Sequence, residues 1–371
     1  MLFSTVITAA RCGDTRVRKE IRDMSREEWT AYKAAIKSMQ ADGSYQSLAQ
    51  IHVDIFQQIH GGYNFAQWHR IYLCKFEDEV RKHSSISDIG IPYYAAWEDS
   101  ARYGANSIDN SPVFTEQYFG AGKGKCVKAD NNTIFTSATT NIGGTHCISR
   151  QFDHTRGISQ RASIQHLETG TSNFKQFSDL LQVGYHAETH LFIAGDMAQH
   201  HSVNDPIFFS HHASVDQIYD QFQASKKDFD ANSIPENSAK AAMFPEYTYG
   251  DAHANKVCCA DYQAYSGSQG FGNPTPTNPP NATATGTNTT VQNTPASADA
   301  LANLGIPADK VDKQNDWNGF KSAFAKGQGA SFVQNLLNNN STGSTKGKPS
   351  SSTTQILSSS VLAIAVLCFL G

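Results

Sequence analysis

The sequence of 371 residues lacks any long block of one charge, with 30 Lys and Arg against 34 Asp and Glu and a formal net charge of −4. A protein that grips nucleic acid normally presents a basic face, so this class is disfavoured. No apolar run before Ile356 is long enough to cross a bilayer, which excludes a polytopic membrane protein. Internal repeats are also missing. With 39% hydrophobic and 11% aromatic residues, the chain can nevertheless bury a sizeable core.

Cysteine usage and glycosylation motifs favour a secreted or cell-surface protein. Seven cysteines are present, and all but Cys368 lie in the body of the chain, where their even number is compatible with disulfides. The sequence leaves their pairing open. Asn-x-Ser/Thr motifs, which are acceptors for N-glycosylation, occur at Asn131, Asn281, Asn288, Asn339 and Asn340.

The two ends of the chain resemble targeting segments. Residues 1–10 are apolar and end in small residues, which fits either a signal peptide or an ordinary buried N-terminus. At the other end, residues 341–371 consist of a polar spacer followed by the short apolar run Ile356–Gly371. This pattern is typical of a glycosylphosphatidylinositol (GPI) attachment signal, with a short tail anchor or a C-terminus packed on the fold as alternatives. Such a lipid anchor is the only membrane contact that we expect.

Composition also divides the chain into segments. Residues 266–300 are rich in Pro, Thr and Asn and are predicted to form an extended linker. A small C-terminal segment, 301–340, follows and is too short for a dependable core of its own. The main folded unit is therefore predicted over residues 11–265.

Helical periodicity dominates this unit. Ser25-x-x-Glu28 is a capping box that opens a first helix, and residues 48–59 form a second apolar stripe. A third helix places His69 and Val80 on one face, with Glu77 and Arg81 as an i,i+4 pair. We expect two more helices, over residues 174–194 and after Asp205-Pro206, whereas residues 91–173 read as irregular with short β-like runs. The fold class is mainly α, a helical bundle with long loops.

Three of these helices carry histidines on their apolar sides. His186 and His190 lie one turn apart on one face, where both imidazoles can reach one metal ion, and His212 can supply a third nitrogen.

A second set lies in the N-terminal half, on His52, His60 and His69. An unbroken helix would keep these three apart, but the Gly61-Gly62 break lets His60 turn back. Two such sets without cysteine or carboxylate suit copper or zinc, and favour a dinuclear redox site over a structural zinc.

Longer motifs around these histidines resemble the two copper signatures of the tyrosinase family, which comprises tyrosinases, catechol oxidases and hemocyanins. The motifs are His60-x4-Phe65-x2-Trp68-His69-Arg70-x2-Leu73-x3-Glu77 and Asp205-Pro206-x-Phe208-Phe209-x2-His212-x3-Asp216. Shorter pieces agree in order, from Arg18-Lys19-Glu20 to Tyr247-x-Tyr249-Gly250-Asp251.

The resemblance implies a four-helix-bundle core that holds two copper ions and uses O₂ as co-substrate. It implies that His52, His60 and His69 bind the first copper, and that His186, His190 and His212 bind the second. His211 would then neighbour a ligand, His200 and His201 would lie in a loop, and His83, His154, His166 and His253 would be exposed.

The resemblance also implies oxidation of small phenols to o-quinones. Many tyrosinases have asparagine after the first histidine of the second copper site, where this chain has Ala187, and neither Asp179 nor Gln182 matches the family's water-holding glutamate. We therefore expect catechol oxidase activity to exceed monophenol hydroxylation. A full tyrosinase, a hemocyanin-like O₂-binding protein and a copper-free scaffold are the alternatives. Phe208 is expected to face the pocket or to pack in the core, and Leu191 and His211 to lie beside the ligands.

Overall fold

The computed structural model describes residues 15–120, 126–127, 138–140, 144–171, 173–226, 235–271, 297–307 and 317, all within one compact unit, Met1–Val333. The predicted signal peptide, the glycosylation motifs and the C-terminal spacer and tail lie outside these residues. Among the helices that are described, none combines the length and the apolar character that a membrane crossing requires.

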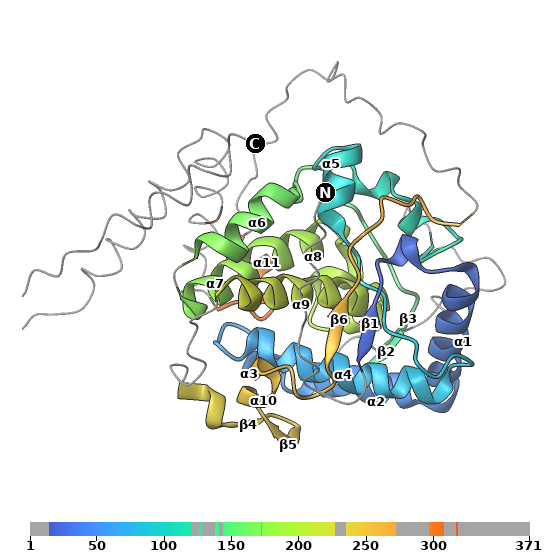
Figure 1. The fold of residues 1–371 in the computed structure, drawn as a ribbon. Helices are drawn as coiled ribbons and strands as arrows, with labels where there is room; N and C mark the ends of the chain where they lie inside the picture. Colours follow the sequence, from blue (N-terminus) through green and yellow to red (C-terminus); the bar gives the residue numbers. More distant parts are fainter. Residues whose placement is uncertain are drawn as a thin grey trace, which may run out of the picture. The chain divides into compact units, whose positions relative to one another are not determined.

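Helices make up most of the described structure (Figure 1). They are α1 (Arg26–Asp42), α2 (Ser44–Asp54), α3 (Phe56–Ile59), α4 (Phe65–His83), α5 (Ala96–Tyr103), α6 (Arg161–Gly170), α7 (Phe174–Leu181), α8 (Ala187–Ile193), α9 (Ile207–Ser225), α10 (Tyr249–His253) and α11 (Ala298–Ala302). Helix α4 packs against both α1 and α9, and α9 also packs against α6. The predicted mainly helical architecture is confirmed.

Short strand pairs tie loops to this bundle. Strand β1 (Arg16–Arg18) runs parallel to β6 (Ala260–Tyr262), so the two ends of the main unit are hydrogen-bonded side by side (Figure 1). Two antiparallel pairs complete the described strands: β2 (Ala138–Thr140) with β3 (Gly144–His146), and β4 (Lys240–Ala241) with β5 (Phe244–Thr248).

The start of α1 follows the predicted chemistry. The Ser25 hydroxyl accepts a hydrogen bond from the Glu28 backbone N–H, and the Glu28 carboxylate accepts one from the Ser25 N–H, which completes the capping box of α1. At α9 the Asp205 carboxylate accepts from the Ile207 N–H at 3.2 Å and also pairs with the buried Arg150 guanidinium.

Two predictions about helices were wrong, the single helix over residues 48–59 and the irregular structure over residues 91–173. Residues 48–59 do not form one helix, because α2 ends at Asp54 and the chain turns at Ile55 before α3 begins. The predicted helical character of residues 174–194 is confirmed, with α7, a π-helical turn from Gln182 to His186, and α8 following one another without a gap. Helices α5 and α6 lie in the region predicted to be irregular.

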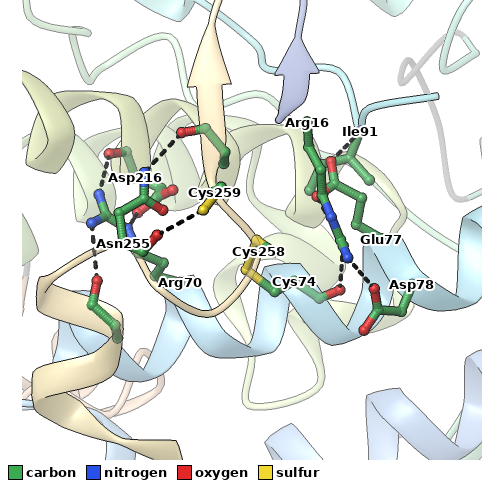
Figure 2. The surroundings of a disulfide bond; sticks show 12 residues. Arg16, Arg70, Cys74, Glu77, Asp78, Ile91, Asp216, Asn255, Cys258 and Cys259 are labelled. Atoms are coloured by element: carbon green, nitrogen blue, oxygen red, sulfur yellow. Dashed lines mark hydrogen bonds and ion pairs between the residues drawn. A yellow bond between two sulfur atoms is a disulfide. The ribbon is translucent and has the colours of Figure 1, made fainter. Parts of the chain in front are cut away.

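A buried ionic network joins β1 to α4 and α9 beside a disulfide between Cys74 and Cys258 (Figure 2). Arg18 is fully buried and pairs with Glu77 at 3.2 Å and with Asp216 at 3.0 Å. Glu77 also accepts a hydrogen bond from the Ile91 N–H at 2.9 Å, and Arg81 donates to the Ile89 carbonyl at 2.9 Å.

A second disulfide joins Cys126 to Cys147, and Cys259 is also disulfide-bonded. The start of the predicted linker packs on the bundle. The Ser266 N–H donates to Asp23 at 2.7 Å, and the Phe271 N–H donates to the Tyr118 hydroxyl at 3.2 Å. Residues 266–271 of the predicted linker therefore belong to the folded unit.

Candidate metal centre

The first histidine set comes together from three consecutive helical elements. His52 lies on α2, His60 directly follows α3, and His69 lies in the first turns of α4. One ligand nitrogen from each ring lies within 4.8 Å of those of the other two. The turn at Ile55, together with the extended backbone of His60, brings His60 back toward His52. The predicted juxtaposition is present, although the helix breaks earlier than Gly61-Gly62.

The second set is built from α8, α9 and the π-helical turn before α8. His186 ends the turn and His190 lies within α8, with their ring centroids 4.6 Å apart. His212 approaches from α9, and its Nε2 lies 3.3 Å from Nε2 of His190. Tetrahedral ligands about 2.0–2.1 Å from one metal ion lie roughly 3.4 Å from each other, which matches this separation.

His211 also lies within 4.8 Å of His186 and His190, so distance alone permits it in place of His212. The two rings differ in orientation. The Nε2 of His211 bonds to the His186 carbonyl at 3.1 Å, so only its Nδ1, which is buried without a hydrogen-bond partner, remains for a metal. His212 turns its Nε2 toward His190 and stacks on His69. We therefore retain His212 as the proposed ligand and place His211 beside it.

The two sets face each other. The rings of His69 and His212 stack with centroids 4.5 Å apart, and those of His60 and His186 lie 6.1 Å apart. Phe65 bridges the sets, with its ring 4.7 Å from both His69 and His186. All six imidazoles are thus gathered in one region of the core.

Backbone carbonyls orient four of the six rings. The Nδ1 atoms of His60 and His69 bond to the carbonyls of Phe56 and Phe65, each at 2.8 Å. Those of His186 and His190 bond to the carbonyls of Gln182 at 3.0 Å and Met197 at 2.6 Å. Because a carbonyl only accepts, each Nδ1 carries the proton and each Nε2 keeps its lone pair for a metal.

Burial keeps these imidazoles neutral. Each of the six is at most 5% exposed, and desolvation lowers the pKa of His60 to about 3 and that of His190 to about 4. The same cause lowers the pKa of His52, His69, His186 and His212 well below its ordinary value. A neutral imidazole is the form that binds a metal ion, so these six side chains can bind metal at neutral pH without first losing a proton.

Unsatisfied nitrogens support the same conclusion. Among the described residues, the Nε2 atoms of His69 and His186 and both ring nitrogens of His52 are buried without a hydrogen-bond partner. Buried polar atoms are nearly always paired, so this concentration of exceptions fits metal coordination. An all-imidazole donor set suits copper, and the residues present fit a dinuclear copper centre.

The predicted pocket residues lie next to the ligands. Phe208 is fully buried and stacks on His212 with centroids 4.0 Å apart, while its edge meets His52. These contacts favour its packing role. Ala187 and Leu191 are also buried, directly after His186 and His190.

Part of the predicted small C-terminal segment lies against the first histidine set, a position that the sequence had left open. Gly305 has φ +70, and a Cβ there would lie 2.6 Å from Cβ of His60. Trp317 is fully buried over Gly184, and its Nε1 donates to Glu188 at 2.8 Å. The described parts of the predicted small C-terminal segment therefore pack on the metal centre.

The remaining histidines differ in exposure. His154 is exposed as predicted, while His83 and His166 are half-buried. The prediction for His253 was wrong, because its ring is 6% exposed and its Nδ1 bonds to the Tyr219 hydroxyl at 2.5 Å. His201 lies beside His146 and Asp196, in a group separate from the six histidines.

A helical bundle that gathers two sets of buried, neutral imidazoles fits a protein with a dinuclear metal centre. Residues 42–225 match the family model described as the common central domain of tyrosinase. The chain belongs to the tyrosinase family of type 3 copper proteins.

Individual relatives are distant. The chain is 25% identical over 246 residues to the tyrosinase-like protein phomQ2 of Diaporthe leptostromiformis, covering 59% of this chain and 61% of that protein. It is 24% identical over 236 residues to hemocyanin type 2 unit e of Rapana venosa, covering 57% of this chain and 54% of that protein. The chain thus spans less than two thirds of the length of both.

Solved structures share the fold. A variant of polyphenol oxidase from Thermothelomyces thermophila superposes with a TM-score of 0.53 at 20% identity, covering 67% of this chain and 88% of that one. Deoxygenated hemocyanin from Rapana thomasiana gives a TM-score of 0.52 at 20% identity, covering 68% and 70%. Enzymes and hemocyanins are both represented, so the fold does not decide the activity.

Proposed function

We propose that the chain is a copper-dependent oxidase that converts o-diphenols into o-quinones, with O₂ as co-substrate and small phenols as substrates. Two bound copper ions would couple oxidation of the phenol to reduction of O₂. The observation that carries the proposal is the convergence of six buried imidazoles, several with unpartnered Nε2 atoms.

Backbone carbonyls orient the imidazoles of this centre, and aromatic side chains pack around them. The carbonyls of Phe56, Phe65, Gln182 and Met197 hold protons on Nδ1 and fix the rings. Phe65 and Phe208 fill the space around the rings and exclude water. Fixed rings in a dry site limit the reorganisation that accompanies electron transfer.

The surroundings of His186 favour diphenols over monophenols. A monophenol needs a base to remove its phenolic proton, and Ala187 offers no hydrogen-bonding side chain. Nearby carboxylates have other partners: Asp179 pairs with Lys175 at 3.0 Å, and Glu188 accepts from Ser159 and Trp317. A diphenol loses its first proton more easily and depends less on such a base.

Oxygen uptake by the copper-loaded chain, measured with a catechol and with the matching monophenol, tests this proposal. We expect rapid uptake with the catechol and slow or lagging uptake with the monophenol. Comparable rates would show that another group acts as the base, and no uptake with either substrate would refute the oxidase assignment.

Reversible O₂ binding is the second candidate, because all six imidazoles are buried and the segment around Gly305 packs over His60. A carrier would show an O₂-dependent near-ultraviolet absorption that reverses under vacuum, with no turnover of catechol. We further propose that the protein acts at the cell surface or after secretion, with the C-terminal lipid anchor as its membrane attachment.

A further inference from the structure

A second cluster of metal-binding side chains lies outside the six-histidine centre, on His146, Asp196 and His201. One ligand atom from each lies within 4.8 Å of the other two. His146 comes from β3, while Asp196 lies in the 3₁₀ turn Gly195–Ala198 and His201 follows that turn. The side chains of the two histidines are 30% and 18% exposed, so solvent ions can reach them, whereas that of Asp196 is 2% exposed.

Both imidazoles converge on one oxygen of one carboxylate. The Nε2 atoms of His146 and His201 each contact Oδ1 of Asp196, the latter at 3.4 Å. The other oxygen, Oδ2, already accepts hydrogen bonds from the Ser149 N–H at 2.7 Å and the Ser149 hydroxyl at 3.1 Å. Ser149 thereby orients the carboxylate as outer hydrogen-bond partners orient metal ligands.

Backbone geometry also holds this arrangement. Ala194 and Gly195 both have positive φ, at 52° and 58°, and a Cβ on Gly195 would collide with the Ser149 carbonyl. The Cys126–Cys147 disulfide restrains the position of Cys147, which directly follows His146. Strained non-glycine residues such as Ala194 often occur at functional sites.

We propose that His146, Asp196 and His201 form a third metal site that binds a divalent cation of the zinc class. Two imidazoles and one carboxylate are a donor set typical of zinc sites that keep one position open. The Nδ1 of His146 bonds to the Gly144 carbonyl at 3.2 Å, so a neutral His146 turns the lone pair of its Nε2 toward the carboxylate, and a cation between them would satisfy both groups. A pocket of about 510 Å³ lined by these residues and by Ser149, Gln151 and Gln199 leaves room for water or another ligand on the open position.

The site adjoins the six-histidine centre without sharing a ligand. Met197, the residue after Asp196, supplies the carbonyl that orients His190. The third site is therefore independent of the proposed oxidase function, and its occupancy can be measured separately.

Zinc titration of the copper-loaded full chain tests the proposal, because copper keeps zinc out of the six-histidine centre. By calorimetry and metal analysis, we expect one zinc ion per chain. The double variant His146→Gln/His201→Gln should lose this ion, while His154→Gln, which removes an exposed histidine elsewhere, should retain it. Ser149→Ala should weaken binding roughly 10–100-fold, because it releases one bond to the carboxylate.

Two outcomes would overturn the proposal: no zinc bound by the wild-type chain, or equal zinc bound by the double variant. Cobalt provides a test that needs no variant. The copper-loaded wild-type chain should develop visible absorption of Co²⁺ in a low-symmetry nitrogen and oxygen site, and the spectrum of aqueous Co²⁺ alone would contradict the assignment.

Discussion

Acid should destabilise the copper-free chain because its histidines are buried in the neutral form. The loss of folding stability can be calculated for His190. Burial lowers its folded pKa to about 4, against about 6.5 in an unfolded chain. Between these values the unfolded imidazole binds a proton and the folded one does not. The stability of the folded state therefore falls as the pH falls through this window.

The magnitude follows from this linkage. Lowering the pH from about 7 to about 5 should remove about 2 kcal/mol of folding stability through His190 alone. His60, with a folded pKa of about 3, should contribute a similar loss. Copper binding competes with protonation of its ligands, so the copper-loaded chain should lose less stability over the same interval.

Urea unfolding of the copper-free wild type, His190→Gln and His154→Gln at the two pH values measures this effect. Replacing His190 with a non-titrating side chain should reduce the pH-dependent loss by about 2 kcal/mol. His154→Gln, which replaces an exposed histidine, is the matched control. If His190→Gln keeps the full dependence of the wild type, the imidazole is not held neutral by burial and the reasoning fails.

Other predictions concern the metal centre and its surroundings. The wild type should bind about two copper ions per chain, and His190→Ala should bind about one and lose oxygen uptake with catechol; two ions with activity would contradict the ligand assignment. Ala187→Asn should raise the monophenol-to-diphenol rate ratio by up to roughly 10²-fold if it holds a basic water, and an unchanged ratio would argue against that role. Trp317→Ala should lower the free energy of unfolding by about 3–5 kcal/mol, because it removes a large buried side chain. Both this substitution and proteolysis between residues 272 and 296 should raise kcat/KM for phenols, and unchanged kinetics in both cases would exclude a covering role. Phosphoinositide-specific phospholipase should release the protein from cells if the chain is processed near Ser341, whereas a recovered peptide reaching Gly371 would exclude the anchor.

The ligand-bearing helices were predictable because their signals are local. The i,i+4 spacing of His186 and His190 and the apolar face around His212 need no tertiary information. The breaks in regular helix that orient these ligands could not be predicted from local signals. The turn at Ile55 contains no glycine or proline to mark it, and the π-helical turn before His186 adds one residue to a pattern that reads as an ordinary helix.

Helices α5 and α6 show how tertiary contacts override weak local patterns. Helix α5 follows two tyrosines and begins at Ala96, whose N–H donates to the distant Tyr185 hydroxyl. Helix α6 contains Glu168, which pairs with Arg161 and whose carbonyl accepts from Ser225 on α9. Both helices are short, so packing rather than periodicity decides their conformation.

Gly305 illustrates a site requirement that becomes visible only in three dimensions. More than two hundred residues separate it from His60, and its neighbours in sequence give no metal-binding pattern. In the folded chain its positive φ and its close approach to His60 and Phe56 leave no room for a side chain. Leu301, Leu304 and Ile306 bury their side chains around it, which holds this glycine against the first histidine set. Residues 301–307 are too few for a core of their own, and their apolar side chains instead join the core around the metal centre.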